Sequence, residues 1–384
     1  MKIMSIFGTR PEIIRLSRIF PLLDKNFEHI MVNTSQNYTK ELNSVFFDDL
    51  NIRKPDYDLK VNTEAYGIEV ADVIVKTEKL LKKEKPDVLL ILGDTNSGLS
   101  AIPAAHQGIK IAHLEAGMRS YDLRMPEEKN RVMIDHLSTV LLPYTNYSRE
   151  NLIRENVHPS KIFVVGNPII EVIEHYMPKI VKSKVLQNLK LKKNNYFLVT
   201  AHRSENVDNQ KSLKNIFSGL EKIYKKFGKK IIYPIHPRTT SKMKNIVIPK
   251  GIELIDPLGF FDFTYLEKNA FCLLTDSGTV PEEALYFKKP CVTIRESTER
   301  PEIIEAGSNI LSGLTPENIL RSTESITAGK PDWQWKEALG DGKTARKVIN
   351  ISTDVEMNKK EINRIVEFLV KHAEITVSAR AFNE

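Results

Sequence analysis

The sequence predicts an α/β protein built of two doubly wound parallel sheets, each covered by helices on both faces, that face one central cleft. Short, continuously apolar strands alternate with helix-length segments, as in parallel sheets that are buried on both sides. A lysine-rich break from Lys182 separates two such series. Almost every strand runs directly into polar residues, and open parallel sheets bind ligands outside the carboxyl ends of their strands. These polar ends predict one site that both halves share.

The expected elements follow this pattern in order. The strands of the first series are "KIMSIF", "HIMVN", "DVLLIL", "KIAHL", "TVLLP" and "IFVVG", and those of the second are "YFLVT", "KIIYPI", "IELI", "FCLLT" and "CVTI". Helical patterns separate most of them, for example at 66–83, 97–107, 209–227 and 315–325. A chain of 384 residues is too long for a single hydrophobic core. We therefore expect one domain at 1–175, a second at 176–355, and a helix at 356–384 that packs back across their interface.

The composition argues against several classes of protein. The net charge of +7 is a signal for nucleic-acid binding, but the lysines are scattered over amphipathic patterns such as "VIVKTEKLLKKEK", which are typical of solvated helix faces. Cys272 and Cys291 lie in apolar runs without metal-ligand spacing. No run reaches the roughly 18 apolar residues of a membrane span, and the first residues lack the features of a signal peptide. We expect a cytoplasmic protein that binds neither nucleic acid nor membrane, with a small anionic substrate.

The segment "LLTDSGTVPEEA" predicts a phosphate site. A strand ends there, Ser277, Gly278 and Thr279 turn the chain, and a helix begins near Pro281. Free amides at a helix N-terminus, beside a glycine and two hydroxyls, bind phosphate well. A carboxylate one turn into the helix can take a pair of ribose hydroxyls. The alternative is an ordinary capped helix start, because Pro and Glu are common in a first turn.

Basic residues at three further strand ends fit a diphosphate. Arg10 in "GTRPE" stands at a turn of the same strand–turn–helix kind, where a guanidinium can hold a phosphate in a bidentate manner. His202 and His236 end two successive strands of the second half, and each is followed closely by an arginine, Arg203 and Arg238. Taken singly, Arg10 can equally be a surface arginine, and a lone histidine is usually a structural or surface residue.

Three carboxylates are expected near the floor of the cleft. Glu115 follows the strand "KIAHL", Asp94 follows "DVLLIL", and Glu127 begins a helix after Pro126. They are candidates for acid/base chemistry. Asp94 can alternatively be an N-cap, and Glu127 or Glu128 can simply complement the helix dipole. We expect no dinucleotide cofactor, because G-x-G-x-x-G is absent, and no metal, because no ligand pattern accompanies the charge.

As an ordered set, these motifs resemble the non-hydrolysing UDP-N-acetylglucosamine 2-epimerase family. The motifs stand in the family's order from Gly8 to at least Gly307. They are "GTRPE", "GDT", "HLEAG", "PEE" with "NR", "HR" with "EN", "TDSG" with "EEA" and "TERPE". The resemblance implies a GT-B fold with UDP in the second domain, a homodimer, and neither metal nor nicotinamide. It implies that Asp94, Glu115 and Glu127 are essential carboxylates, that His202 is catalytic or contacts phosphate, that Arg10 and His236 bind diphosphate, that Ser277 and Gly278 form the diphosphate turn, and that Glu283 binds ribose. Arg15, Arg131, Arg203 and Thr279 complete the expected UDP-sugar site.

The implied reaction inverts C2 of a UDP-N-acetylhexosamine, UDP-GlcNAc to UDP-ManNAc, as a precursor step for surface polysaccharides. Because no carbonyl acidifies the C2 proton, UDP leaves first, a glycal forms, and UDP adds back.

The chain departs from the family where sugar choice is set. Arg15 replaces the usual lysine, the loop at "GMRSYDLRMPEE" is two residues shorter, and "SQNY" replaces "GQHR". These changes resemble the subgroup that epimerises UDP-2-acetamido-2,6-dideoxy-L-talose to UDP-N-acetyl-L-fucosamine, which stays an alternative. A metal-independent GT-B glycosyltransferase is a more distant one.

Overall fold

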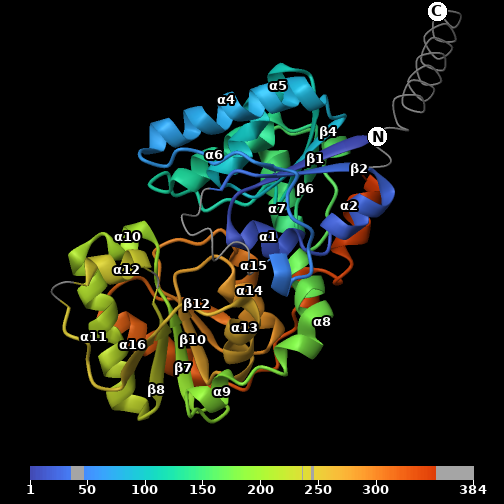
Figure 1. Ribbon diagram of the computed structural model, residues 1–384. Coiled ribbons are helices and arrows are strands. Elements are labelled where there is room, and N and C mark those ends of the chain that lie inside the picture. The colour runs from blue at the N-terminus through green and yellow to red at the C-terminus, as the bar shows by residue number, and fades with distance from the viewer. Residues whose placement is uncertain (36–46, 236, 244–245, 352–384) are drawn as a thin grey trace, which may run out of the picture.

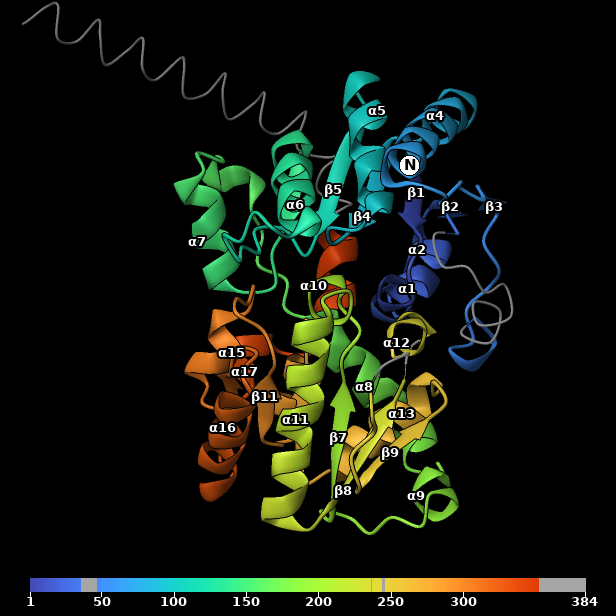
Figure 2. The same cartoon turned by 90° about the vertical axis from the view of Figure 1, so that its left-hand side faces the viewer.

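The computed structural model describes residues 1–35, 47–235, 237–243 and 246–351. Within this part of the chain the strands form two six-stranded sheets, and every paired strand runs parallel to its neighbour. In Figures 1 and 2 the first half lies above the second, with α1 at the lower edge of the first half and α10 at the upper edge of the second. The prediction of two doubly wound parallel sheets is confirmed.

The first sheet has the strand order β3-β2-β1-β4-β5-β6. Its strands are β1 (Lys2–Phe7), β2 (Glu28–Asn33), β3 (Tyr57–Asp58), β4 (Val88–Leu92), β5 (Lys110–Leu114) and β6 (Val140–Leu142). The helices of this half are α1 (Arg10–Leu16), α2 (Phe20–Asn26), α4 (Tyr66–Glu84), η1 (Asn96–Ser100), α5 (Ala101–His106), α6 (Pro126–Leu137), α7 (Asn146–Arg154) and η2 (Pro159–Lys161). All five residues of β4 are buried, because helices cover both faces of the sheet.

The second sheet repeats this order, as β12-β11-β10-β7-β8-β9. Its strands are β7 (Tyr196–Thr200), β8 (Lys230–Pro234), β9 (Ile252–Ile255), β10 (Cys272–Thr275), β11 (Cys291–Thr293) and β12 (Asn309–Leu311). Its helices are α9 (Val185–Asn188), α10 (Ser204–Val207), α11 (Gln210–Phe227), α12 (Pro237–Lys242), α13 (Phe260–Asn269), α14 (Val280–Tyr286), α15 (Pro301–Glu305), α16 (Pro316–Ala328) and α17 (Lys336–Leu339).

Both sheets reverse their strand order at one point, which is where ligands bind in such folds. The switch point lies between β1 and β4 in the first sheet and between β7 and β10 in the second. Because α1 follows β1 directly and lies at the border between the halves, the carboxyl ends of the first sheet point to that border (Figure 1). The fold therefore directs the polar loops after β1 and β4 towards the second half.

The helix α8 (Pro168–Ile180) connects the halves. It packs against α1 of the first half and against α13 and α14 of the second, and one cluster of buried apolar side chains runs through it. The expected boundary between residues 175 and 176 falls inside this helix. The helix expected at 356–384 lies outside the described residues.

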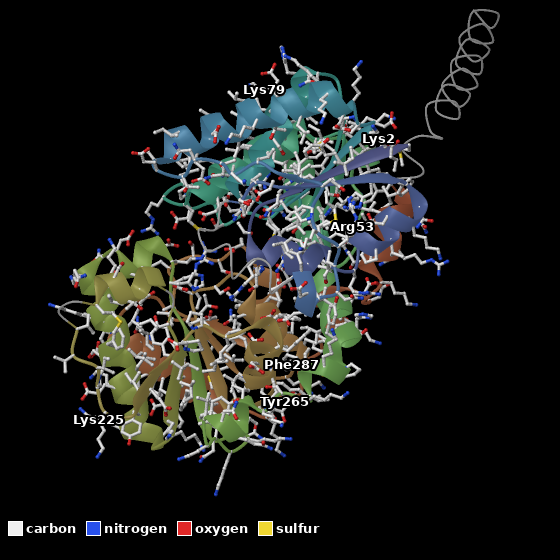
Figure 3. The ribbon with its side chains drawn as sticks, viewed as in Figure 1. Lys2, Arg53, Lys79, Lys225, Tyr265 and Phe287 are labelled. Atoms are coloured by element: carbon white, nitrogen blue, oxygen red, sulfur yellow. The ribbon has the colours of Figure 1, made fainter. Side chains whose placement is uncertain are left out.

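Two further expectations concern details of the pattern. The strand expected at "IFVVG" is wrong, since only Ile162 forms an isolated bridge, to Leu141, and Phe163 and Val164 are exposed. The lysines behave as expected for solvated helix faces: Figure 3 shows Lys79 on α4 and Lys225 on α11 at the outer surface. None of the described helices is both long and apolar enough to span a membrane.

Candidate active site

The buried carboxylate of Glu12 joins the two turns at the first switch point. Its Oε2 accepts hydrogen bonds from the backbone N–H of Gly8 and Thr9, at 3.1 and 2.8 Å, and its Oε1 accepts one from Ser97 Oγ at 2.5 Å. The β1–α1 turn, which carries Arg10, is thereby held beside the β4–η1 turn, which carries Asp94. Burial raises the pKa of Glu12, and these hydrogen bonds oppose the rise.

Glu115 stands at the carboxyl end of β5 in the left-handed region, with φ of +75°. Non-glycine residues adopt this conformation infrequently, and examples are found repeatedly at functional sites. Its carboxylate accepts hydrogen bonds from Arg15 at 2.5 Å, from Tyr144 Oη at 3.1 Å and from Arg300 at 2.9 Å. The predicted carboxylate is therefore held by groups from both halves of the chain.

These contacts belong to a closed ring of four alternating charges. Arg15 donates to Glu115 through Nη1 and to Glu282 through Nη2, each at 2.5 Å. Arg300 closes the ring, donating through Nε to Glu282 and through Nη2 to Glu115. Arg15 and Glu115 come from the first half, whereas Glu282 and Arg300 come from the second. Arg15 makes these two separate contacts with the two ends of one planar guanidinium, which a lysine ammonium cannot reproduce.

Asp94 forms a two-point ion pair with Arg131 of α6, with Oδ2 lying 3.1 Å from Nε and 2.5 Å from Nη2. Arg131 also pairs with Glu128. Glu128 in turn accepts hydrogen bonds from the backbone N–H of Ser120 and Tyr121, so it fixes the loop before α6. Of the two glutamates that begin this helix, Glu128 therefore has a structural role.

Glu127, the other glutamate, is half-buried. It makes no hydrogen bond or ion pair with the described residues, but its charge acts on Arg203 of the second half. Burial alone would lower the pKa of Arg203. The carboxylates of Glu299 and Glu127 have the opposite effect and outweigh it, so the pKa of Arg203 lies above its usual value. The three predicted carboxylates thus differ in their surroundings: Glu115 is held by two arginines, Asp94 by one, and Glu127 by none.

Asp276 arranges the loop after β7. This fully buried carboxylate accepts hydrogen bonds from the backbone N–H of His202 and Arg203, at 3.0 and 2.9 Å, and from the Asn206 side chain at 3.0 Å. Burial lowers the pKa of His202, and the positive charges of Arg203 and Arg10 lower it further against the opposing effect of Asp276. The three predicted basic groups, Arg10, His202 and Arg203, therefore come together from the two halves.

The turn before α14 is more crowded than expected. Its amides are partly occupied: Ser277 N–H donates to Thr275 Oγ1 at 2.9 Å, and Thr279 N–H donates to Ser277 Oγ at 3.2 Å. A Cβ on Gly278 would lie 2.5 Å from Glu299 Oε1, so a larger residue there would displace this carboxylate from its ion pairs with Arg295 and Arg300. The Ser277 and Thr279 hydroxyls, 3.1 Å apart, remain beside the predicted diphosphate position.

Glu283 forms a buried pair of carboxyl groups with Glu267 of α13. Burial raises the pKa of Glu283 to about 7. The pKa of Glu267 lies well above its usual value for the same reason and because of Glu283. Both oxygens of Glu267 are buried, and neither has a hydrogen-bond partner among the described residues. Because ionising a buried carboxyl group that lacks hydrogen-bond donors is costly, we expect the two groups to share a proton in the folded protein, next to the position expected to bind ribose.

This pair predicts that stability falls as pH rises. The folded pair retains a proton that the unfolded chain releases near pH 4.5, so its contribution is complete below that pH and is lost through about pH 7. Between pH 5 and 8 the wild type should lose up to about 3 kcal/mol more unfolding free energy than Glu267→Gln. Urea titrations at both pH values measure this, with the exposed Glu253→Gln as control. Equal losses in wild type and Glu267→Gln would contradict the shared proton.

A cavity of about 280 Å³ lies between the halves, and its lining includes Asn206, which contacts Asp276, but none of the three predicted carboxylates. Its walls include Asp122 and Arg124 of the shortened loop before α6 and Glu296 and Ser297 of the loop after β11. Arg124 pairs with Glu296 at 2.9 Å, and Ser297 donates to Asp122 at 3.0 Å, so the two loops meet across the cleft.

One predicted residue cannot be placed, and four residues of the candidate site were not predicted. His236 lies outside the described residues. Asp276, Glu282, Arg300 and Tyr144 complete the site but were not singled out. The strand-end rule applies to Asp276, and Glu282 and Arg300 lie in motifs already noted, whereas Tyr144 carries no such signal. In the described part of the chain, no three His, Cys, Asp or Glu side chains are grouped to hold a metal.

Comparisons with known proteins agree with this geometry. The sequence model of UDP-N-acetylglucosamine 2-epimerase matches residues 23–353. The UDP-N-acetylglucosamine 2-epimerase of Methanocaldococcus jannaschii is 41% identical, covering 92% of this chain and 99% of the relative. That of Methanococcus maripaludis is 42% identical, with coverage of 91% and 98%. The UDP-2,3-diacetamido-2,3-dideoxy-D-glucuronate 2-epimerase of Pseudomonas aeruginosa is 32% identical, with coverage of 91% and 98%.

Solved structures give the same result. The M. jannaschii enzyme, crystallised in complex with UDP-GlcNAc and UDP, superposes with a TM-score of 0.87 at 41% identity, covering 92% of this chain and 99% of the other. The Rickettsia bellii UDP-N-acetylglucosamine 2-epimerase has a TM-score of 0.86 at 39% identity, with coverage of 94% and 98%. The predicted GT-B arrangement is confirmed by this likeness. The chain belongs to the UDP-N-acetylglucosamine 2-epimerase family.

Proposed function

We propose that this protein interconverts UDP-GlcNAc and UDP-ManNAc by eliminating UDP and adding it back to a glycal. The observation that carries the proposal is that carboxylates of the first half and arginines of the second half face each other where the two halves are in contact. Carboxylates of the first half, Glu115 and Glu127, lie within electrostatic reach of arginines of the second half, Arg300 and Arg203. A cleft with anionic and cationic walls suits a reaction in which a sugar cation and a diphosphate anion separate.

The bond changes explain why both sets are required. The C1–O bond breaks first, and its electron pair leaves with the β-phosphate oxygen of UDP. Arg10, Arg203 and His202 would stabilise that departing charge. A carboxylate then takes the C2 proton, and the C2–H electrons form the C1–C2 double bond of the glycal. Re-addition reverses these steps after a proton has been delivered to the other face of C2.

The surroundings of the three carboxylates suggest a division of roles. Glu115 is positioned by ion pairs with Arg15 and Arg300, and its negative charge would stabilise the developing cation at C1. Glu127 can take or give a proton without breaking an ion pair with the described residues. Asp94, bound to Arg131 alone, would be the second proton-transfer group on the opposite face. Proton transfer on two faces needs two such groups.

Proton NMR in D2O tests the proposal, with EDTA present and no nicotinamide. UDP-ManNAc should form from UDP-GlcNAc and carry deuterium at C2, because solvent exchanges with the carboxylate that takes the proton. Product without deuterium would contradict elimination and re-addition. Absence of turnover on UDP-GlcNAc but turnover of UDP-2-acetamido-2,6-dideoxy-L-talose would assign the chain to the fucosamine reaction. If neither nucleotide sugar is turned over and radiolabelled sugar is transferred to an acceptor, the result would instead indicate a glycosyltransferase.

We also infer a cytoplasmic homodimer that supplies precursors for surface polysaccharides. Cys272 and Cys291 are buried and free, which suits a reducing compartment. Light scattering after gel filtration should give twice the chain mass of 43.9 kDa. A mass of one chain would contradict the dimer.

A further inference from the structure

Behind the three carboxylates lies a buried pair, His113 and Asp135, that the proposed mechanism does not use. His113 lies in β5 and Asp135 near the end of α6, and both side chains are fully buried. His113 Nδ1 lies 2.7 Å from Asp135 Oδ1, and His113 Nε2 lies 2.9 Å from the carbonyl oxygen of Gly93. The other carboxylate oxygen of Asp135 accepts from Gly117 N–H at 3.0 Å and from Arg119 at 2.8 Å.

Each of these bonds ends next to a candidate carboxylate. Gly93 directly precedes Asp94, and Gly117 follows Glu115 by two residues. Asp135 lies one helical turn after Arg131, the partner of Asp94, on the helix that begins with Glu127. The buried pair is therefore hydrogen-bonded to the backbone beside Asp94 and near Glu115, and its Asp135 belongs to the helix whose first turn holds Glu127.

The connected backbone is one that needs support. Gly93, Glu115 and Gly117 all have positive φ, of +73°, +75° and +78°. A Cβ on Gly117 would lie 2.2 Å from the carbonyl oxygen of Ser148, so this turn is also closely packed against α7. Backbone in sparsely populated conformations persists only where neighbouring contacts hold it. The hydrogen bonds of His113 and Asp135 act at two of these three positions.

The carboxylate of Asp135 is surrounded by hydrogen-bonding groups. Burial pushes the pKa of Asp135 up, but His113 and Arg119 outweigh this effect and leave the pKa below its usual value. An ionised Asp135 offers only acceptors, and so does the Gly93 carbonyl. Each ring nitrogen of His113 therefore faces an acceptor, one on α6 and one in the backbone before Asp94.

We propose that His113 and Asp135 are positioning residues for the epimerisation, holding Asp94, Glu115 and Glu127 in register with one another. The inference rests on the proposed function, because it assigns the pair to the geometry of that reaction. Misplacing a reacting group by about 1 Å can cost a hundredfold in rate. Loss of the pair should therefore lower kcat strongly and leave KM nearly unchanged, since the nucleotide is expected to bind in the other half.

A graded set of variants separates position from charge. His113→Phe removes both hydrogen bonds. His113→Gln keeps a donor near the Nε2 position, and His113→Asn keeps one near Nδ1, so each retains one connection. Asp135→Asn retains the whole network: its oxygen accepts from Gly117 and Arg119, and its amide donates to a neutral His113. Asp135→Asn removes only the charge.

Kinetics in the UDP-GlcNAc assay, with UDP affinity by calorimetry as the check of folding, tests the proposal. His113→Phe should lose about a hundredfold in kcat with KM within threefold, Asp135→Asn less than fivefold, and the Gln and Asn variants of His113 should lie between. If Asp135→Asn lowers kcat as much as His113→Phe does, the charge of the pair matters and not its positioning of the backbone, which would overturn the proposal. So would kcat within twofold of wild type in His113→Phe, or in both His113→Gln and His113→Asn if the Phe variant does not fold. Wild type is assayed first, because an inactive wild type refutes the proposed function instead.

Discussion

Glu115→Gln should lower kcat by about a thousandfold while leaving the affinity for UDP unchanged. The substitution keeps the shape of the side chain but removes the negative charge beside the carbon where positive charge develops. It also leaves Arg15 and Arg300 facing a neutral amide, so their charges would oppose the sugar cation. Removing one well-placed electrostatic group typically costs a hundredfold to a thousandfold, and the second effect adds to the first.

Steady-state kinetics and UDP calorimetry measure this result. The matched control is Glu155→Gln, because Glu155 also pairs with an arginine of the first half, Arg119, but lies away from the cleft ring. That control should keep kcat within about threefold of wild type. If Glu115→Gln retains a tenth or more of the wild-type kcat, Glu115 is not the group that stabilises the cation.

Much of the site could be predicted because the strand-end rule depends on local pattern alone. Continuous apolar strands predict a parallel sheet, and the residue after each strand is then placed at the carboxyl edge. This rule places Asp94, Glu115 and His202 at the carboxyl edges of the two sheets. Hydrophobic periodicity predicted the main helices for the same reason, since it requires only neighbouring residues.

The contacts between the halves could not be predicted in this way. Arg15 reaches Glu282 across 267 positions of sequence, and Arg300 reaches Glu115 across 185. Such pairs depend on how two separately formed sheets are placed against each other, which no local pattern specifies. The same holds for Tyr144, whose role follows only from its hydroxyl lying 3.1 Å from Glu115.

The glutamates show a second limit, which is chemical. In "PEE" and "EEA" two adjacent glutamates look alike in sequence, yet each pair divides its roles. Glu128 fixes a loop and Glu127 lies towards the second half, while Glu282 joins the charged ring and Glu283 lies beside the buried carboxyl group of Glu267. Adjacent helical residues point about 100° apart, so each faces a different set of neighbours. Only the packed structure distinguishes them.

The charged ring leads to the prediction with the largest expected effect on stability. Arg300 contacts three carboxylates, those of Glu115, Glu282 and Glu299, and is itself buried. Arg300→Met would leave these buried charges without their shared partner. Breaking a buried ion pair on one side typically costs 3–5 kcal/mol. We therefore expect the free energy of unfolding to fall by about 4 kcal/mol and kcat to fall at least a hundredfold.

A double variant separates the two losses. In Arg300→Met with Glu282→Leu the buried charges are again balanced, and replacing an ion pair by apolar groups is often neutral for stability. This protein should recover most of the unfolding free energy in urea titrations but not kcat, because Glu115 still lacks Arg300. Arg321→Met, at an exposed arginine of the same half, is the control and should change neither quantity. If the double variant also recovers kcat, Arg300 contributes only stability, and the ring plays no part in setting the charge of Glu115.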